Sequence, residues 1–355
     1  MTVVRQWTAP GGINLLGDHL DDYGGPVLSI AIDRQLSLKA RLRNDDAVRV
    51  WTTMGGSQAV EFTLTAEPGE VADWAAPVAG VIRTLAEAGH HLHGADLVMG
   101  GDLTAGAGLS STAAMESVLV YALNDLLELK LDRRALAALV GGAAAHQVAL
   151  NGGAGQATLV DTSKEPVTAE AVDADWASAG LSLVVIDTNT RRQSAGDQLA
   201  ERQEECRRAA GVLDLERLGA AGPDAVLKLD DELLKARTRH AITETARVRG
   251  AVRALRTGNW TQFGSMLTAS HASLRDDFAV SRMELDIAVE SSLEAGALGA
   301  RMTGAGFAGS AIALIETENL GTLAAKISSR FTFHEFAAPT LFKVTSADGV
   351  MEITP

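Results

Sequence analysis

The sequence has few of the features that mark secreted, membrane-bound or nucleic-acid-binding proteins. Among its 355 residues only Cys206 is a cysteine, so no internal disulfide can form, and this fits a reducing compartment. No apolar run reaches the roughly 18 residues that indicate a membrane-spanning helix. The first residues also lack the apolar core of a secretory signal. These absences predict a cytoplasmic protein with no membrane partner.

Positive charge is also in short supply. Lys and Arg together number 31 against 45 Asp and Glu, which gives a formal net charge of −14. We therefore expect neither nucleic acid nor an anionic membrane as a partner. No internal repeat or low-complexity tract is visible. The 46% hydrophobic and 21% charged residues are typical of a globular protein, and the length allows two domains.

The most informative stretch is a loop of small residues that leads into a helix. Residues 101–116 read GDLTAGAGLSSTAAME, and apolar residues on a helical period follow. A helix N-terminus presents unpaired backbone N–H groups at the positive end of the helix dipole, which favours an anion such as phosphate. An ordinary helix start with a serine cluster explains the loop alone about equally well. No Gly-Lys-Ser or Gly-Lys-Thr follows, so this is not a Walker-type loop.

A second unusual segment lies near the N-terminus. Residues 8–25 read TAPGGINLLGDHLDDYGG, rich in turn-forming residues, with three carboxylates and one histidine between Asp18 and Asp22. Taken alone, such a cluster is more often a solvated acidic turn than a binding site.

The remaining pattern mixes strands and helices. Strands are expected at 25–33, 35–43, 47–53 and 181–190, and helices at 73–89, from Asp132 onward, and over 231–272 with a turn at 257–259. This order, without strict alternation, predicts an α+β fold in two parts. The boundary is expected near 172–180, which gives domains of 1–175 and 176–355.

Three separated motifs together resemble one family. They are APGGINLLGDH at 9–19, TAGAGLSSTAA at 104–114 and RMTGAGFAGSAIAL at 301–314. In this order they resemble the GHMP small-molecule kinases, and the segments HASLRDDFAVSRMELD and VVIDTNTRRQ are similar to galactokinases in particular. The resemblance implies a ribosomal-S5-like N-terminal domain and a ferredoxin-like C-terminal domain. It also implies a kinase that uses ATP and Mg²⁺ to convert galactose to galactose 1-phosphate, as a monomer or weak dimer.

The resemblance also implies where the ligands bind. The loop would wrap the ATP phosphates, with Ser111 and Thr112 also near the metal; its members are Gly106, Ala107, Gly108, Leu109, Ser110, Ser111 and Thr112. Asp18, His19 and Asp21 would face the sugar, since carboxylates accept hydroxyl hydrogen bonds in fixed directions. Gly304 and Gly306 of the third motif would complete the substrate site. Arg301 beside them would either meet phosphate or form a surface salt bridge.

Two catalytic positions depart from the family pattern. Gly12 stands where these kinases have an arginine, and His146 stands where they have a catalytic aspartate. A second alignment puts Gln156 at the aspartate position, but no Asp or Glu occurs anywhere from Arg133 to Val160. His146 is then the one local base to nominate, since an imidazole accepts a proton near neutral pH. A purely structural histidine is the simpler interpretation.

These departures leave three hypotheses open. The first is a galactokinase-type kinase, weak or with an altered substrate. The second is a non-catalytic sugar and nucleotide sensor, motivated by Gly12 and the acid-free segment. The third is a kinase for another small alcohol, because Leu199 stands where the family has a sugar-contacting tyrosine.

Overall fold

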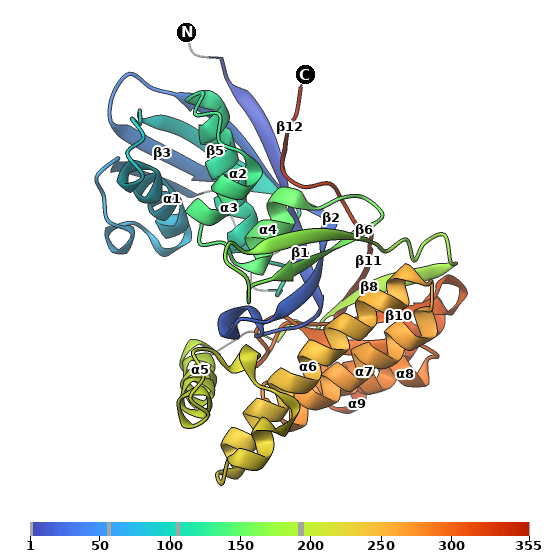
Figure 1. Ribbon diagram of the computed structural model, residues 1–355. Coiled ribbons are helices and arrows are strands. Elements are labelled where there is room, and N and C mark those ends of the chain that lie inside the picture. The colour runs from blue at the N-terminus through green and yellow to red at the C-terminus, as the bar shows by residue number, and fades with distance from the viewer. Residues whose placement is uncertain (1–2, 55–57, 104–106, 191–194, 355) are drawn as a thin grey trace.

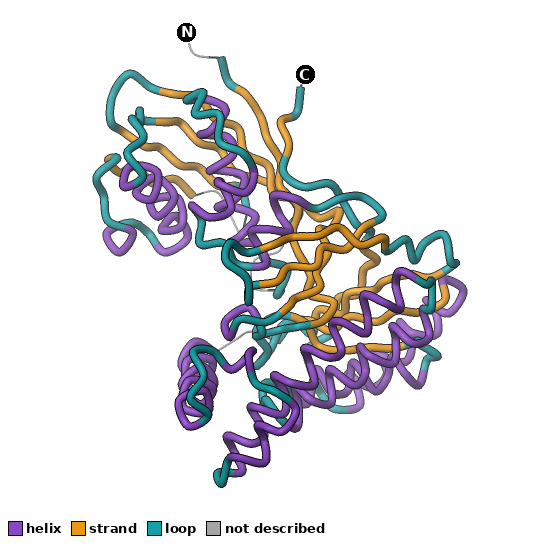
Figure 2. Tube along the Cα trace, in the orientation of Figure 1, coloured by secondary structure: helices purple, strands orange, loops and turns teal. Residues whose placement is uncertain are grey.

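The computed structural model describes residues 3–54, 58–103, 107–190 and 195–354, whose strands form two sheets. Figure 1 shows the first sheet with its helices in the upper half of the molecule, and the second sheet with a group of long helices below it. In Figure 2 the strands of both sheets meet near the middle, so the candidate motifs at their ends can come together. No helix in the described ranges combines the length and apolar character needed to cross a membrane.

The first sheet has eight strands in the described part of the chain, in the order β12-β1-β2-β5-β3-β4, with β6 paired to β2 and β7 paired to β6. Its strands are β1 (Arg5–Leu16), β2 (Pro26–Leu42), β3 (Ala47–Thr52), β4 (Gln58–Thr63), β5 (Ala95–Gly101), β6 (Gln156–Asp161), β7 (Thr168–Asp173) and β12 (Met351–Glu352). The helices of this half are α1 (Ala76–Glu87), α2 (Ser111–Leu126), α3 (Arg133–Leu139) and α4 (Ala144–Asn151), with short 3₁₀ turns η1 (Asp21–Tyr23), η2 (Pro68–Glu70) and η3 (Asp73–Ala75).

Strand β1 differs from the sequence-based expectation. The segment that turn-forming residues mark as irregular is a buried inner strand as far as Leu16, between β2 and β12. A register shift falls between Pro10 and Gly11, and such a bulge is where a sheet tolerates proline. Likewise, the two strands expected at 25–33 and 35–43 are one continuous strand, β2.

The second sheet has four strands in the order β11-β8-β10-β9. They are β8 (Leu181–Asp187), β9 (Gly299–Thr303), β10 (Ser310–Glu316) and β11 (Thr340–Val344). Its helices are α5 (Ala195–Val212), α6 (Glu232–Arg256), α7 (Trp260–Asp276), α8 (Met283–Glu294) and α9 (Leu320–Phe333), with 3₁₀ turns η4 (Leu218–Ala220), η5 (Pro223–Lys228) and η6 (Thr317–Asn319). The predicted helices over 231–272 are confirmed as α6 and α7, broken at the predicted turn.

Helix starts follow their sequence signals. Asp132 begins the predicted helix α3 by accepting a hydrogen bond from the Ala135 N–H at 2.8 Å. Asp231 does the same for α6 with the N–H of Leu233. Each cap satisfies a backbone donor that the first helical turn otherwise leaves unpaired.

The second half depends on a very close approach between α7 and β9. A Cβ atom on Gly299 would overlap the backbone carbonyl of Gly264, and a Cβ on Gly264 would overlap that of Leu298. Because the atoms that would be overlapped belong to the backbone, they cannot move aside as a flexible side chain could. The two glycines therefore set the distance between the helix and the sheet edge.

We expect Gly299→Ala to lower the free energy of unfolding by about 3 kcal/mol, because the added methyl must push α7 off the sheet. Gly321→Ala in α9 is the matched control, since nothing lies within 4 Å of its added methyl. That variant should be neutral or more stable by up to about 1 kcal/mol. Urea unfolding of both proteins measures the difference. Equal stability of the two variants would contradict the close packing.

Candidate functional site

The loop before α2 rests on strand β1 and touches the second half of the molecule. The Gly12 N–H donates to the Leu109 carbonyl at 3.0 Å, and the Ser310 hydroxyl donates to the Ala107 carbonyl at 2.7 Å. Ala107 and Leu109 are buried, whereas Ser111 is partly exposed and Thr112 is exposed. The loop is therefore fixed from behind by both motifs that flank it in space.

The start of α2 leaves its first amide groups available. Ser110 adopts a left-handed conformation with φ 55° and its side chain makes no capping hydrogen bond. The first-turn N–H groups therefore lack the side-chain acceptor that usually satisfies them. Such a terminus suits an anion. Gly106 of the predicted loop lies outside the described residues, and Gly108 has a φ of 79° that favours glycine.

Residues 17–25 form a turn between β1 and β2 that we call the acidic turn. Gly17 has a φ of 92°, and a Cβ there would lie 2.5 Å from the Pro26 carbonyl oxygen, so only glycine fits. The Thr162 hydroxyl contacts the carbonyls of Asp21 at 3.2 Å and Gly25 at 3.0 Å. Thr162 thereby holds the middle and the C-terminal end of the turn in place.

Asp18, expected to face the sugar, is only 2% exposed. Its carboxylate pairs with Arg301 at 2.5 Å and accepts hydrogen bonds from the Asn14 side chain at 2.6 Å and the Gly304 N–H at 3.3 Å. Burial raises the pKa of Asp18, and the Arg301 charge opposes that rise. In this structure the carboxylate therefore joins the acidic turn to the third motif instead of presenting an open acceptor.

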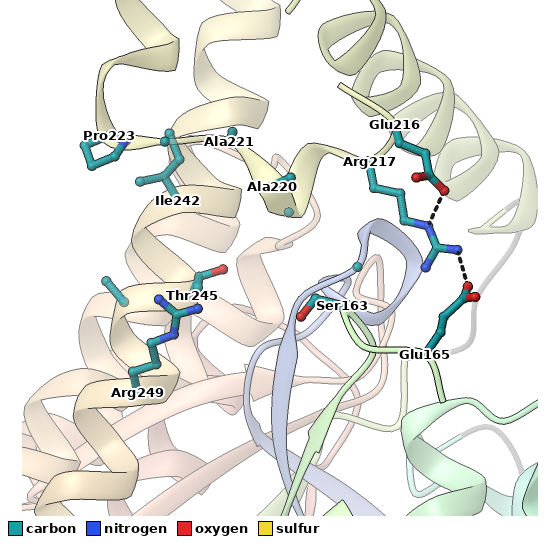
Figure 3. Close-up of a pocket in the computed structure, with 14 residues that line it drawn as sticks. Ser163, Glu165, Glu216, Arg217, Ala220, Ala221, Pro223, Ile242, Thr245 and Arg249 are labelled. Carbon is teal, nitrogen blue, oxygen red and sulfur yellow. Dashed lines mark ion pairs between the residues drawn. The ribbon is translucent and has the colours of Figure 1, made fainter. Parts of the chain in front are cut away.

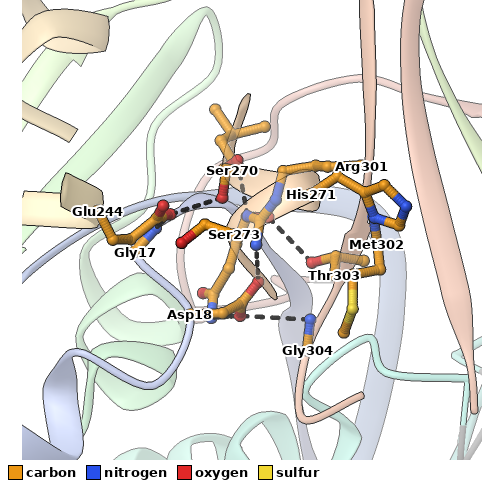
Figure 4. Close-up of polar contacts among 12 residues, drawn as sticks. Gly17, Asp18, Glu244, Ser270, His271, Ser273, Arg301, Met302, Thr303 and Gly304 are labelled. Carbon is orange, nitrogen blue, oxygen red and sulfur yellow. Dashed lines mark hydrogen bonds and ion pairs between the residues drawn. The ribbon is translucent and has the colours of Figure 1, made fainter. Parts of the chain in front are cut away.

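Arg301 does not form the surface salt bridge that the sequence allowed. It is fully buried, and besides Asp18 it donates to the Leu15 carbonyl at 2.8 Å. Glu244 of α6 is also fully buried and accepts hydrogen bonds from the Gly17 N–H at 2.8 Å and the Ser270 hydroxyl at 2.7 Å. Figure 4 shows these groups converging on the turn from different elements. We call Asp18, Arg301 and Glu244 the buried charge cluster.

His19 and Asp21 lie on the acidic turn in different surroundings. His19, with φ 70°, stacks on Phe278 with ring centroids 4.6 Å apart, and His240 packs on the same ring at 4.8 Å. Burial lowers the pKa of His240 to about 4, so this imidazole is neutral at physiological pH. Burial, followed by the charges of Asp22 and Asp18, raises the pKa of Asp21 to about 7. Asp21 therefore titrates near neutrality.

The third motif meets the acidic turn through its glycines. Gly304 and Gly306 have φ values of 81° and 78°, and a Cβ on Gly306 would lie 2.5 Å from the Val280 carbonyl oxygen. Gly304 donates its N–H to Asp18, as described above. Gly304 therefore contacts the turn directly, while Gly306 packs against the segment after α7.

The two departures from the family pattern lie on elements that converge at the start of α2. A Cβ on Gly12 would lie 3.3 Å from the Ser110 hydroxyl oxygen and 3.7 Å from a methyl of Val148 in α4. His146 lies on the first turns of the same α4, with its Nε2 2.6 Å from a carboxylate oxygen of Glu116 in α2. Sequence reasoning did not identify Glu116, although it follows Thr112 by one helical turn.

A separate cavity of about 790 Å³ lies behind the acidic turn, between the β6–β7 connection, η4 and α6. Figure 3 shows Arg217 there between Glu216 and Glu165, with Thr245 and Arg249 on the opposite wall. None of the predicted site residues lines it.

Comparisons with known proteins identify the same family as the three sequence motifs. Residues 4–41 match the galactokinase galactose-binding signature, 76–160 the GHMP kinases N terminal domain and 251–332 the GHMP kinases C terminal model. Galactokinase from Streptomyces coelicolor is 35% identical over 98% of this chain and 94% of its own length. Galactokinase from Mycobacterium bovis is 33% identical over 99% of both chains.

Solved structures of the same family are also similar to this chain. The Lactococcus lactis galactokinase complexed with galactose has a TM-score of 0.89 and 30% identity, over 99% of this chain and 95% of that one. The mevalonate kinase of L. major in complex with R-mevalonate shares the fold alone, at 18% identity, a TM-score of 0.67 and coverage of 98% of this chain and 97% of that one. The predicted two-domain GHMP fold is thus confirmed, and the chain belongs to the galactokinase family of the GHMP kinases.

Proposed function

We propose that this protein is an ATP-dependent kinase that phosphorylates the anomeric hydroxyl of galactose to give galactose 1-phosphate. The full-length likeness to a galactose-bound galactokinase carries the proposal, because it includes the galactose-binding signature at 4–41. Both ligand-facing segments are present and are held together through the third motif. We further propose that the enzyme works in the cytoplasm as a monomer or weak dimer.

ATP would bind with its phosphates at the start of α2. The uncapped first-turn amides and the positive end of the helix dipole supply fixed partial charges for the transferring phosphoryl group. Because these donors are part of the backbone, they need little reorganisation during the reaction. The loop from Ala107 to Ser110 is braced by Ser310 and by Gly12, which keeps those donors in place.

The residues at this helix start also suit a magnesium ion. Among the described residues, no group of three or more His, Cys, Asp or Glu side chains forms a metal site. Ser111, which is partly exposed, and Thr112, which is exposed, instead offer hydroxyls, and Mg²⁺ commonly takes its other ligands from phosphate oxygens and water. These two residues would hold Mg²⁺, which supplies charge neutralisation for the phosphates.

Galactose would bind at the acidic turn. Asp21 and His19 are the members proposed to contact sugar hydroxyls, with Asp18 and Gly304 holding the turn behind them. The sequence nominates His146 as the proton acceptor, and in the structure its Nε2 atom lies 2.6 Å from a carboxylate oxygen of Glu116. Leu199 is partly buried against the core, where it contributes apolar surface.

The proposal is tested by incubating the purified protein with Mg-ATP and a panel of hexoses, measuring ADP release and identifying the product by ³¹P NMR. Galactose-dependent ADP release with galactose 1-phosphate as product is the expected result. Calorimetric titration with a non-hydrolysable ATP analogue and with galactose runs in parallel. Binding of both ligands without turnover would refute the kinase and indicate a sensor instead. Turnover with another alcohol but not with galactose would refute galactose as the substrate.

Galactose affinity should weaken as the pH falls from 8 to 6. The pKa of Asp21 is about 7, and protonation removes an acceptor for sugar hydroxyls. If only the ionised form binds, the dissociation constant rises by up to about tenfold over this range. Titration calorimetry at several pH values measures it. Asp21→Asn should abolish the dependence, and Asp22→Asn should move it to lower pH because the Asp22 charge contributes to the shift. A pH-independent wild type would contradict the role of Asp21.

A further inference from the structure

We propose that Glu116 is the proton acceptor of this site and that His146 is the positioning residue that holds it. The inference rests on the proposed kinase function and reverses the roles that the sequence favours. It starts from the contact of 2.6 Å between the Nε2 atom of His146 and a carboxylate oxygen of Glu116. The two residues come from neighbouring helices, α4 and α2.

The chemistry of the pair fixes which group donates. An ionised carboxylate can only accept hydrogen bonds, so the Nε2 atom of His146 carries the hydrogen and donates it. The other ring nitrogen, Nδ1, is buried and has no hydrogen-bond partner in the described part of the structure. Neither nitrogen is therefore open to a substrate hydroxyl.

The carboxylate is the more open member of the pair. The Glu116 side chain is 23% exposed and that of His146 is 12% exposed. Only one Glu116 oxygen is engaged by His146, and no hydrogen bond among the described residues occupies the other. A proton acceptor needs such a free lone pair within reach of the substrate. By this criterion Glu116 qualifies and His146 does not.

The place of Glu116 on α2 supports the assignment. It follows Thr112 by four residues, so the two side chains lie on the same side of the helix, about 5–6 Å apart at their Cβ atoms. Thr112 ends the loop proposed to hold the phosphates. The start of α2 is also where Gly12 and α4 converge, as the contacts of Gly12 with Ser110 and Val148 show. A carboxylate is thus present although residues 133–160 contain none.

The step is a single phosphoryl transfer. The anomeric hydroxyl oxygen of galactose forms a bond to the γ-phosphorus of ATP, and the bond from that phosphorus to the β–γ bridging oxygen breaks. The bridging oxygen leaves with the electron pair as part of ADP. The hydroxyl proton moves to the free oxygen of Glu116. The Nε2–H of His146 keeps the carboxylate oriented throughout and transfers no proton itself.

Four variants test the division of roles: Glu116→Gln, His146→Gln, His146→Ala and Glu87→Gln. Glu116→Gln keeps the shape and an acceptor for Nε2–H but removes the base, so kcat should fall about 10²- to 10⁴-fold with little change in KM for galactose. His146→Gln retains an N–H donor at similar reach and should lose less than His146→Ala, which should lose about 10- to 100-fold. Glu87, in an exposed ion pair with Arg83, is the control and should leave activity unchanged.

Each outcome has a defined consequence. Affinity for the ATP analogue should stay within about threefold in all four proteins, which separates loss of the base from loss of the fold. Full activity of Glu116→Gln would overturn the assignment of Glu116 as the base. The assignment would also fail if both His146 variants were equally inactive while Glu116→Gln stayed active. Either result would leave the proposed kinase function standing. If the wild-type protein forms no sugar phosphate, both the proposed function and the role of Glu116 as proton acceptor are overturned.

Discussion

Replacing Gly12 with arginine is expected to raise kcat at least about 100-fold, because an arginine that stabilises the charge of phosphoryl transfer contributes about 10³- to 10⁵-fold in other enzymes of this chemistry. A side chain at this position would start from β1 beside Ser110, at the helix start proposed to hold the phosphates. The wild type has no arginine there to supply that positive charge.

The Cβ atom that begins the new side chain fits at modest cost. Gly12 lacks a positive φ, so its backbone accepts any residue, and the nearest atoms to an added Cβ are side-chain atoms of Ser110 at 3.3 and 3.4 Å. A shift of a few tenths of an ångström in that side chain suffices. Gly12→Gln adds a side chain of comparable bulk without the charge and is the matched control.

Steady-state kinetics of ADP release compares the wild type, Gly12→Arg and Gly12→Gln. Equal rates for the arginine and glutamine variants would show that the charge does not reach the reacting phosphate. Adding His146→Asp should reduce the gain. The new carboxylate would face Glu116 across a contact that now joins a donor to an acceptor, and two carboxylates repel each other at such a distance.

Arg301→Met is expected to lower the free energy of unfolding by about 3–5 kcal/mol, the usual effect of removing one partner from a buried ion pair. Arg301 is fully buried, and its loss leaves the carboxylate of Asp18 without a counter-charge. It also removes the donor to the carbonyl of Leu15 at the end of β1. Galactose binding should fall together with stability, because the same contacts hold the acidic turn.

Urea unfolding measures the loss, and Arg330→Met is the control. Arg330 pairs with Glu290 at 3.5 Å and with Glu294 at 3.8 Å, and 35% of its side chain is exposed to solvent, so its removal should cost no more than about 1 kcal/mol. Similar losses for the two variants would mean that Arg301 contributes no more than a surface pair.

The buried charge cluster also determines how the stability of the protein changes with pH. Burial raises the pKa of Glu244, but the charge of Arg301, the charge that His240 acquires below about pH 4 and the charge of Arg247 outweigh burial and hold that pKa at about 2. Because this value lies below the ordinary one of 4.5, the contribution of Glu244 is present above about pH 4.5 and is lost as the pH falls towards 2. Arg301→Met removes one of these charges, so acid unfolding should begin at a higher pH.

Much of the fold followed from local signals in the sequence. Asp132 and the turn at 257–259 mark helix ends through backbone groups that neighbouring residues satisfy, and such local chemistry is visible in the chain. Strand β1 was missed because Pro10, Gly11 and Gly12 normally favour turns. Their conformation here is set by β2 and by the loop at Leu109, which are distant in sequence.

The arrangement of the site was harder to predict from the sequence for the same reason. The motifs located the acidic turn and the helix start, since each is a continuous segment. The partnership of Asp18 with Arg301, and of Glu116 with His146, joins residues from different elements. An exposed and a fully buried arginine look the same in a sequence, so Arg301 could be assigned only after the two halves were seen in contact.

The pairing of β12 with β1 has a consequence for synthesis on the ribosome. Trp7 pairs with Glu352, and the Ile353 N–H donates to the Gln6 carbonyl, so part of one edge of β1 is covered by a segment that is translated long after it. Until that segment is made, the backbone N–H and C=O groups on this edge of β1 have no partner. They can then pair with a strand of another nascent chain on the same polysome. Chaperone capture of stalled chains should therefore depend on β1 and cease once β12 has emerged.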